Sequence, residues 1–289
     1  MCYDNNIMDN AKVTPLILLS VAVGDAYGAG FEFETPEVVE RENNGRHYRK
    51  RAGFTPGHYT DDTQMTLAIW EAMCLSEPWT PHYLANRFVS AYHRDPRPGY
   101  ARGFEGVLKE CKNGADLLGK LNPTSDRNGA AMRSVPLGLL SSVTKVKAYA
   151  KVQAAITHNT PGGIASSQAV GLMAHFGLKH LGKLGELAAF LEKHVPGTPW
   201  SEPWKGEVPL HGVSTVRAAL TALITCRKQF DLLRAAVAFT GDTDSVAAIA
   251  LGCSACFSEY QQDLPAVLIR GLENGLYGRD YLKALEATK

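Results

Sequence analysis

The amino-acid sequence predicts an all-α fold, and two observations support this fold class. Apolar residues recur at three- and four-residue intervals through most of the 289 residues, which is the spacing of amphipathic helices. The sequence lacks the series of alternating β-branched runs and hairpin turns that would indicate a sheet. A chain of this length can bury one large core, so we expect a single domain over residues 1–289, with residues 1–12 flexible.

The first helix is expected to begin with Thr14 as its N-cap and Pro15 at its first helical position, and to run through Val23 towards Ala29. The same apolar spacing predicts further helices at residues 62–74, 81–92, 103–111, 129–140, 144–156, 164–180, 184–194, 213–227, 230–239, 244–260 and 264–272.

Two long segments lack helical spacing. Residues 31–59 mix glycine, aromatic and charged residues, and residues 195–211 contain four prolines and two tryptophans. We expect both to be irregular. Loops of this length are usually functional or disordered, and the first one ends at an acidic motif described below.

Composition excludes several classes of protein. The net charge is +1, with 20% charged and 45% hydrophobic residues, so no global field attracts nucleic acid or an anionic membrane. The apolar run at residues 16–23 is shorter than the roughly 20 residues of a membrane span. The N-terminal residues carry aspartate and asparagine where a signal peptide carries basic residues. We expect a cytoplasmic protein with reduced thiols, and a monomer.

Cysteines at positions 253 and 256 have CxxC spacing. They lie within an expected helix among small apolar residues, where residues three apart share a face. We therefore favour packing in the core over a redox or metal-binding role.

Two acidic motifs separated by about 180 residues are the strongest functional signal. Residues 60–62 read Thr-Asp-Asp and residues 242–245 read Asp-Thr-Asp-Ser, each at the start of an expected helix. Helix capping is one explanation, with Asp61 and Gln64 forming a capping box and Asp242 or Asp244 capping the later helix. Capping does not require two carboxylates at each site, however. If the motifs meet in space, the four carboxylates repel one another unless cations lie between them.

The types of ligand indicate which cations would bind. Carboxylate and hydroxyl oxygens suit Mg²⁺ and Mn²⁺, and neither motif contains the cysteine or histidine that is typical of a zinc site. The sequence therefore suggests a binuclear site of two divalent cations that activates water.

Other candidates are weaker when each is taken alone. Glu32, between two phenylalanines, is either a base with a raised pKa or an ordinary loop glutamate. Residues 128–133 are either a phosphate-binding turn or a plain junction between a loop and a helix. His158 is either a catalytic residue or a structural one, and Tyr100 either stacks against a ligand or packs in the core. The arginines Arg94, Arg97 and Arg102 either bind an anion or form salt bridges, and the sequence does not choose between these roles.

Taken in order, the motifs resemble those of the ADP-ribosylglycohydrolase family, which includes the dinitrogenase-reductase-activating glycohydrolases. The resemblance runs from Gly24 to about Gly252 and rests on GDAYGAGFEF, YTDDTQMTLA, NGAAMRSVPLG, the Thr-His pair at 157–158, and GDTDSVAAIALG. It implies an all-α fold around a binuclear Mg²⁺ or Mn²⁺ centre, and hydrolysis of an ADP-ribosyl group.

The resemblance also implies residue roles. The metal ligands would be Thr60, Asp61, Asp62, Asp242, Asp244 and Ser245. The resemblance also places Glu32 beside the metals, and we expect Glu32, Asp61, Asp62 and Asp244 to be catalytic. For substrate binding it implies Asn128, Gly129 and His158, and from the residues themselves we expect Tyr100, Ala130 and Met132 to contact substrate as well.

Three positions depart from the pattern of the family. Thr240 replaces a glycine before Gly241, Arg127 replaces a glycine before Asn128, and Ser245 replaces a threonine while keeping its hydroxyl. None of these changes removes a ligand, but Arg127 alters the loop that would contact substrate.

The expected reaction is attack by a metal-activated water at the anomeric carbon of ADP-ribosyl-arginine on a protein, with ADP-ribose as a product. The acceptor could instead be serine, a nucleic acid or a small molecule. A catalytically silent ADP-ribose-binding protein and a metal-dependent phosphoesterase are further alternatives. No membrane or non-specific nucleic-acid partner is expected.

Overall fold

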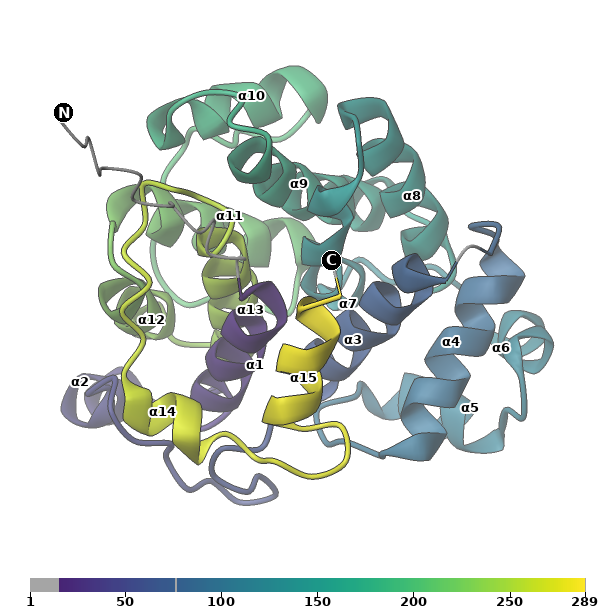
Figure 1. Cartoon of the computed structure of the whole chain (residues 1–289), viewed down its shortest axis with the longest axis horizontal. Coiled ribbons are helices and arrows are strands. Elements are labelled where there is room, and N and C mark those ends of the chain that lie inside the picture. The colour runs from purple at the N-terminus through teal and green to yellow at the C-terminus, as the bar shows by residue number, and fades with distance from the viewer. Residues whose placement is uncertain (1–15, 76, 289) are drawn as a thin grey trace, which may run out of the picture.

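The computed structural model describes residues 16–75 and 77–288, and it is built from helices joined by loops (Figure 1). Across those two ranges there is no β-sheet, only isolated bridges, so the all-α prediction is confirmed. The α-helices are α1 (Ile17–Gly28), α2 (Pro36–Glu42), α3 (Asp61–Cys74), α4 (Pro81–Arg94), α5 (Arg102–Glu110), α6 (Gly114–Lys120), α7 (Gly129–Met132), α8 (Val143–Ala155), α9 (Pro161–Leu178), α10 (Leu187–His194), α11 (Gly212–Thr225), α12 (Gln229–Ala238), α13 (Thr243–Ser254), α14 (Ala266–Gly271) and α15 (Arg279–Glu286). Short 3₁₀ helices are η1 (Val135–Leu139) and η2 (Leu184–Glu186).

Helices α1 and α13 form the centre of the fold and pack against each other more extensively than any other described pair. Every residue of both helices is buried, as expected for helices that are apolar on all sides. Gly24 lies against Ala247, and Gly28 lies against Thr243 and Asp244, so the two helices run antiparallel. The C-terminal end of α1 therefore meets the N-terminal end of α13, where the second acidic motif lies.

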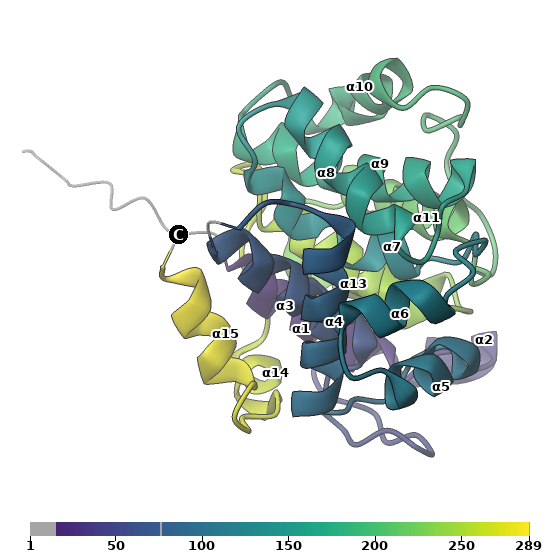
Figure 2. The same ribbon diagram turned by 90° about the vertical axis from the view of Figure 1, so that its right-hand side faces the viewer.

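The remaining helices surround this pair (Figures 1 and 2). Helices α3, α9, α11 and α12 pack against α13, and α3 also packs against α1. Helices α4, α5 and α6 form a neighbouring group, and α15 lies along α1. The N-terminal end of α3 is thereby brought to the same end of the central pair as the N-terminal end of α13.

Most expected helices are confirmed, but three others were not predicted. α2 lies in the 31–59 segment that was expected to be irregular, and that expectation is wrong for residues 36–42. It has a Thr35 cap, whose hydroxyl accepts from the Val38 N–H at 3.5 Å, and Pro36 at its first position. α6 begins after Asn113, which caps it through the Asp116 N–H at 3.0 Å. α15 is the third helix that was not predicted.

Two expected helices differ from the observed elements by more than a few residues. The helix expected at 129–140 is divided into α7 and η1, because Pro136 cannot donate a backbone hydrogen bond within a helix. The helix expected at 244–260 ends at Ser254. The predicted cap at Thr14 and Pro15, and the flexible segment 1–12, lie outside the described residues. Residues 195–211 contain no helix, as predicted.

Cys253 and Cys256 are buried in α13 and just beyond it, and both are free thiols, which agrees with a packing role. Burial raises the pKa of both thiols, so they are poor nucleophiles. Among the described helices, none is long and apolar enough to cross a membrane.

Candidate metal centre and cavity

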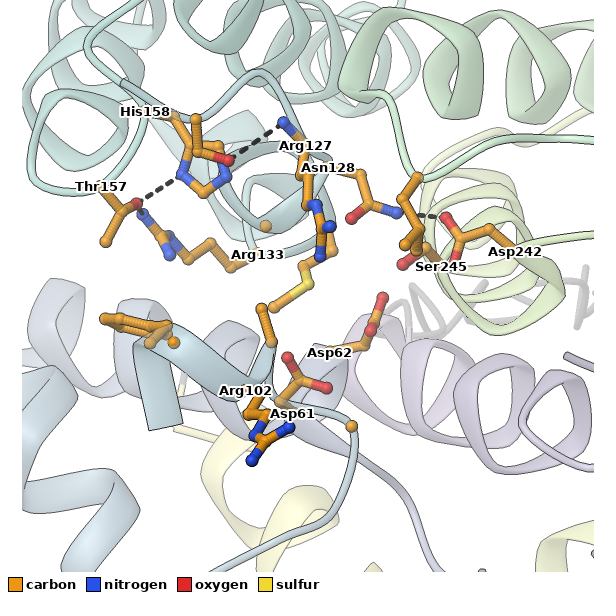
Figure 3. A pocket seen from close by; sticks show the side chains of 18 of the residues that line it. Asp61, Asp62, Arg102, Arg127, Asn128, Arg133, Thr157, His158, Asp242 and Ser245 are labelled. Carbon is orange, nitrogen blue, oxygen red and sulfur yellow. Dashed lines mark hydrogen bonds between the residues drawn. The ribbon is translucent and has the colours of Figure 1, made fainter. Parts of the chain in front are cut away.

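A cavity of about 590 Å³ lies at the N-terminal ends of α3 and α13 (Figure 3). Loops that precede α5, α7 and α9 complete its wall. The predicted site residues that line it are Glu32, Asp61, Asp62, Asn128, Gly129, Met132, His158, Asp242, Asp244 and Ser245. Thr60, Tyr100 and Ala130 are buried behind this lining.

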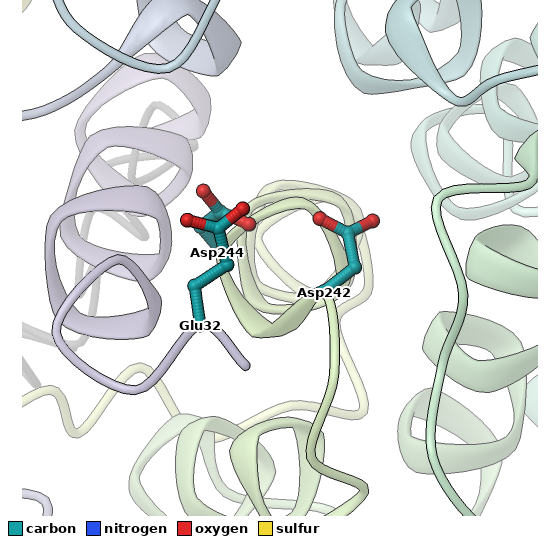
Figure 4. A group of neighbouring side chains, drawn as sticks. All are labelled: Glu32, Asp242 and Asp244. Atoms are coloured by element: carbon teal, nitrogen blue, oxygen red, sulfur yellow. The ribbon is translucent and has the colours of Figure 1, made fainter. Parts of the chain in front are cut away.

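Carboxylates from three segments meet in this cavity. Glu32 follows α1, and Asp242 and Asp244 belong to the start of α13; their nearest oxygens all lie within 4.8 Å of one another (Figure 4). Asp61 and Asp62 enter the same cavity from the first turn of α3. The two acidic motifs therefore meet in one cavity, which is the condition under which their carboxylates need cations between them.

Burial makes this cluster costly to ionise. It raises the pKa of Asp61, Asp62 and Asp244 well above the ordinary range for aspartate. Burial raises the pKa of Asp242 to about 7, and the charge of Glu32 adds to this effect. Without cations, the folded protein keeps part of the cluster protonated at neutral pH.

The oxygen atoms of the cluster fit divalent cations. Asp62 Oδ1 is buried and has no hydrogen-bond partner, although buried polar atoms nearly always have one. Carboxylate oxygens are the donors that Mg²⁺ and Mn²⁺ prefer. A cation would give the orphaned oxygen a partner and offset the charge, so the residues present fit such ions.

The start of α3 is capped by Thr60, not by Asp61. The Thr60 hydroxyl accepts from the Asp62 N–H at 3.4 Å, and Asp61 is the first helical residue. The predicted capping box of Asp61 and Gln64 is therefore wrong: the Gln64 side chain donates to the Asp95 carbonyl and accepts from Tyr100. Neither Asp61 nor Asp62 is therefore used to cap the helix.

Asp25 in α1 holds the start of α3 in place. This fully buried carboxylate accepts from the N–H groups of Thr60 and Thr63, each at 2.9 Å to Oδ2, and from their hydroxyls at 2.8 and 2.6 Å. Such bonds satisfy donors that have no partner within the helix. Sequence reasoning missed this role, because the contact joins residues 35 and 38 positions apart.

A left-handed backbone joins the loop of Glu32 to the second motif. Phe33 has φ 55°, Thr240 has φ 63° and Gly241 has φ 75°. The Phe33 N–H donates to the Gly241 carbonyl at 2.8 Å, next to Glu32 on one side and Asp242 on the other. This conformation favours glycine and costs about 1–2 kcal/mol for other residues. Thr240, which departs from the family pattern, therefore occupies a strained position beside the cavity.

The wall opposite Glu32 contains the segment 128–133. The Asn128 side-chain amide donates to Asp242 Oδ2, so this segment is tied to the acidic cluster. Gly129 and Met132 line the cavity. Ala130 does not: its carbonyl accepts from the buried side chains of Ser134 and Gln153.

Arg133 is a buried cation in this wall. It donates to Gln153 Oε1 at 2.5 Å and to Thr157 Oγ1 at 2.8 Å, and among the described residues it forms no ion pair with a carboxylate. Burial lowers the pKa of Arg133 to about 9, which leaves it cationic at neutral pH.

His158 is neutral beside this cation. Burial and Arg133 lower the pKa of His158 to about 3. Its Nδ1 lies 2.6 Å from the Thr157 hydroxyl, which already receives the Arg133 N–H. This arrangement favours the tautomer with the proton on Nε2, so His158 suits hydrogen bonding to a ligand better than proton transfer.

The remaining polar candidates differ in their placement. The Tyr100 hydroxyl donates to Gln64 Oε1 at 2.6 Å, and Phe104 is the aromatic residue of the same segment that lines the cavity. Arg94 pairs with Glu71, and Arg97 pairs with Asp95 and Glu273.

Arg102 and Arg127 are exposed and line the cavity. Within the described ranges neither side chain forms an ion pair with a carboxylate. The cavity therefore contains basic side chains as well as the acidic cluster, and Arg102 lies beside Asp61 (Figure 3).

Comparison with protein families gives a match over nearly the whole chain. The family model described as ADP-ribosylglycohydrolase matches residues 16–288. ADP-ribosyl-[dinitrogen reductase] glycohydrolase of Rhodospirillum rubrum is 28% identical over 80% of this chain and 81% of the relative. ADP-ribosylarginine hydrolase Tri1 of Serratia proteamaculans is 25% identical over 85% of this chain and 70% of the relative.

Two further comparisons extend this result. ADP-ribosylhydrolase ARH3 of mouse is 30% identical over 56% of this chain, which spans 48% of the mouse protein. A solved structure, titled "ADP-ribosylglycohydrolase-related protein complex", superposes with a TM-score of 0.72 at 24% identity and covers 94% of this chain and 95% of the other. The latter likeness shows a shared fold.

Proposed function

Because the chain belongs to the ADP-ribosylglycohydrolase family, we propose that it hydrolyses ADP-ribosyl-arginine on a protein, with two divalent cations in the acidic cavity. The observation that carries the proposal is the meeting of Glu32 with both acidic motifs in one cavity. Two named relatives act on ADP-ribosylated dinitrogen reductase and on ADP-ribosylarginine, which favours arginine as the acceptor.

The residues of the acidic cluster would hold the cations. Asp61, Asp62, Asp242 and Asp244 offer carboxylate oxygens, and Ser245 and Thr60 offer hydroxyls. The Thr60 hydroxyl donates its proton to Asp25 and accepts from the Asp62 N–H, which leaves one lone pair for a cation. Divalent cations bound there would lower the pKa of a coordinated water and so supply a nucleophile at neutral pH.

Glu32 is the proposed proton carrier. It is only partly buried and borders the cluster, so it can reach a water at the centre of the cavity. Glu32 takes a proton from the attacking water as the bond between the anomeric carbon and the acceptor nitrogen breaks. Glu32 then passes this proton to the departing arginine, and the hydroxyl from the water stays on the anomeric carbon of ADP-ribose.

Basic side chains in the cavity suit the diphosphate of ADP-ribose. Among the described residues, the buried cation Arg133 forms no ion pair with a carboxylate, and the exposed Arg102 and Arg127 add positive charge. Asn128, Gly129 and His158 line the same cavity. We propose that these basic residues bind the diphosphate while the anomeric carbon lies at the acidic cluster.

A panel of ADP-ribosylated acceptors tests this function. Release of free ADP-ribose is measured from arginine-linked, serine-linked and nucleic-acid-linked substrates, each with Mg²⁺ or Mn²⁺ and with a chelator. We expect the arginine linkage to be cleaved fastest, in the presence of metal. Binding of ADP-ribose with no turnover of any substrate would instead support a catalytically silent binding protein, and release of phosphate would support a phosphoesterase.

The raised pKa values predict an unusual dependence of stability on pH. A raised pKa means that the folded protein binds more protons than the unfolded chain. The contribution of Asp242 to metal-free stability is therefore lost as the pH rises from about 4 through about 7, the pKa of Asp242 in the folded protein. Cations replace these protons. A Mg²⁺ or Mn²⁺ concentration of 100 times the dissociation constant at pH 8 should therefore add about 2.7 kcal/mol to the free energy of unfolding at pH 8, and the same concentration should add less at pH 5.5. Melting temperatures with chelator and with metal, at both pH values, measure the effect. Equal metal-induced shifts at the two values would contradict it.

The choice between Mg²⁺ and Mn²⁺, a cytoplasmic location and a monomeric state remain predictions from the sequence. The panel above and a measurement of mass in solution address the first and the third of these.

A further inference from the structure

Glu32 is held by a basic side chain that lies outside the acidic cluster. Arg51 Nη1 donates to Glu32 Oε2 at 2.6 Å and to the Ala29 carbonyl at 3.2 Å. The guanidinium also lies 4.7 Å from the centre of the Phe54 ring. Both partners of the ion pair are largely shielded, with side chains 23% and 17% exposed for Arg51 and Glu32.

Arg51 is itself placed by a short turn. Residues 51 and 54 form an isolated antiparallel bridge, closed by the Phe54 N–H donating to the Arg51 carbonyl at 3.1 Å. Gly53 within the turn has φ 82°, a conformation that favours glycine. The turn and the Phe54 ring limit the positions open to the guanidinium, so the bond to Glu32 does not depend on a freely rotating side chain.

Five carboxylates line the cavity: Glu32, Asp61, Asp62, Asp242 and Asp244. Arg51 contacts one of them, Glu32. In the part of the chain that the structure describes, it is the one basic residue that forms an ion pair with any of the five.

Arg51 and the cations would share the same carboxylate. A carboxylate oxygen of Glu32 lies within 4.8 Å of oxygens of Asp242 and Asp244, and Arg51 donates to Oε2 of the same carboxylate. We propose that Arg51 is a positioning residue: it holds Glu32 at the edge of the metal centre and competes with the cations for that carboxylate. The proposal rests on the proposed function and adds a residue to it.

Arg49 provides a matched control in the same loop. It donates to Glu34 at 2.8 Å, to Glu42 at 2.5 Å and to the Gly30 carbonyl at 2.7 Å, and its side chain is 21% exposed. It therefore ties the same loop to α1 and α2 with similar burial, but it does not contact Glu32. Differences between variants at 49 and 51 report on Glu32 and not on the loop in general.

The test compares Arg51→Ala, Arg51→Lys and Arg49→Ala for Mn²⁺ affinity by calorimetry and for kcat of ADP-ribose release. Removing the competing charge should tighten Mn²⁺ binding by about five- to tenfold in Arg51→Ala, while the loss of Glu32 positioning lowers kcat at least about tenfold. Arg51→Lys should be intermediate, because lysine keeps the charge but not the planar geometry. Arg49→Ala should stay within about twofold of the parent in both.

Tighter metal binding together with slower turnover is a combination that general damage to the loop does not produce. Unchanged or weaker Mn²⁺ binding in Arg51→Ala, or a kcat within about twofold of the parent, would overturn the proposal. If Arg51→Ala does not fold, Arg51→Lys decides by the same criteria. An inactive parent protein would refute the proposed function, whereas the calorimetric comparison would still decide whether Arg51 competes for Glu32.

Discussion

Replacing Asp244 with asparagine is expected to lower ADP-ribose release by at least about 100-fold. Asp244 is buried at the first turn of α13, and its carboxylate lies beside Glu32 and Asp242. Asparagine keeps the shape of the side chain but removes the negative charge that would bind a cation. The measurement is kcat for the Asp244→Asn variant under saturating Mn²⁺.

The same substitution should leave the metal-free protein equally stable or more stable. Asp244 has a raised pKa because of burial and the nearby Glu32, so ionising it in the folded state costs free energy that asparagine avoids. Asp231→Asn is a matched control on the exposed surface of α12, and its activity and melting temperature should stay close to those of the parent. Undiminished turnover in Asp244→Asn would contradict a metal-centred mechanism.

Replacing Gly28 with alanine should destabilise the fold and disturb the site together. A Cβ atom at Gly28 would lie 2.5 Å from both the Asp244 Cα and the Thr243 carbonyl oxygen. Because α1 and α13 are the central pair, they would have to separate at the point where the acidic motif begins. Overpacking of this kind costs about 1–3 kcal/mol or more, and metal affinity should fall because Asp244 moves. Urea denaturation followed by circular dichroism measures the loss.

Gly106→Ala is the control for this substitution. Gly106 lies within α5, and an added Cβ atom would meet nothing within 4 Å. Alanine is favoured over glycine inside a helix, so this variant should be unchanged or more stable by up to about 1 kcal/mol. If Gly28→Ala behaved like Gly106→Ala, the close packing of α1 against α13 would not be what positions the second motif.

Long helices with repeated apolar spacing could be predicted from the sequence. The expected helices at 62–74 and 81–92 differ from α3 and α4 by one or two residues at an end. Short helices were harder, because seven residues contain too few apolar repeats to be recognised. α2 and α6 are of this length, and only their caps, Thr35 and Asn113, could have identified them.

The C-terminal helix illustrates a second difficulty. α15 carries apolar residues at helical spacing, Tyr281, Leu282 and Leu285, so its existence could have been predicted. Its attachment could not: the buried Glu286 carboxylate accepts from the Leu18 N–H at the start of α1, 268 residues away, at 2.5 Å.

The acidic motifs could be found from charge alone, whereas their supports could not. Asp25, Arg51 and the left-handed residues Phe33 and Thr240 act through contacts between separate segments. Spacing along the chain carries no signal for such contacts. The sequence did identify Thr240 and Arg127 as departures from the family pattern, and both lie at or beside the cavity.

Addition of metal to the metal-free protein is the most direct test of metal-dependent hydrolysis in this cavity. Protein stripped of metal by a chelator is given ADP-ribosyl-arginine substrate while Mn²⁺ is added in steps, and ADP-ribose release is measured with the number of bound ions per chain. We expect no release without metal, and full activity when two ions are bound to each chain. Full activity in metal-free protein, or full activity with one ion bound to each chain, would contradict a mechanism that uses two cations.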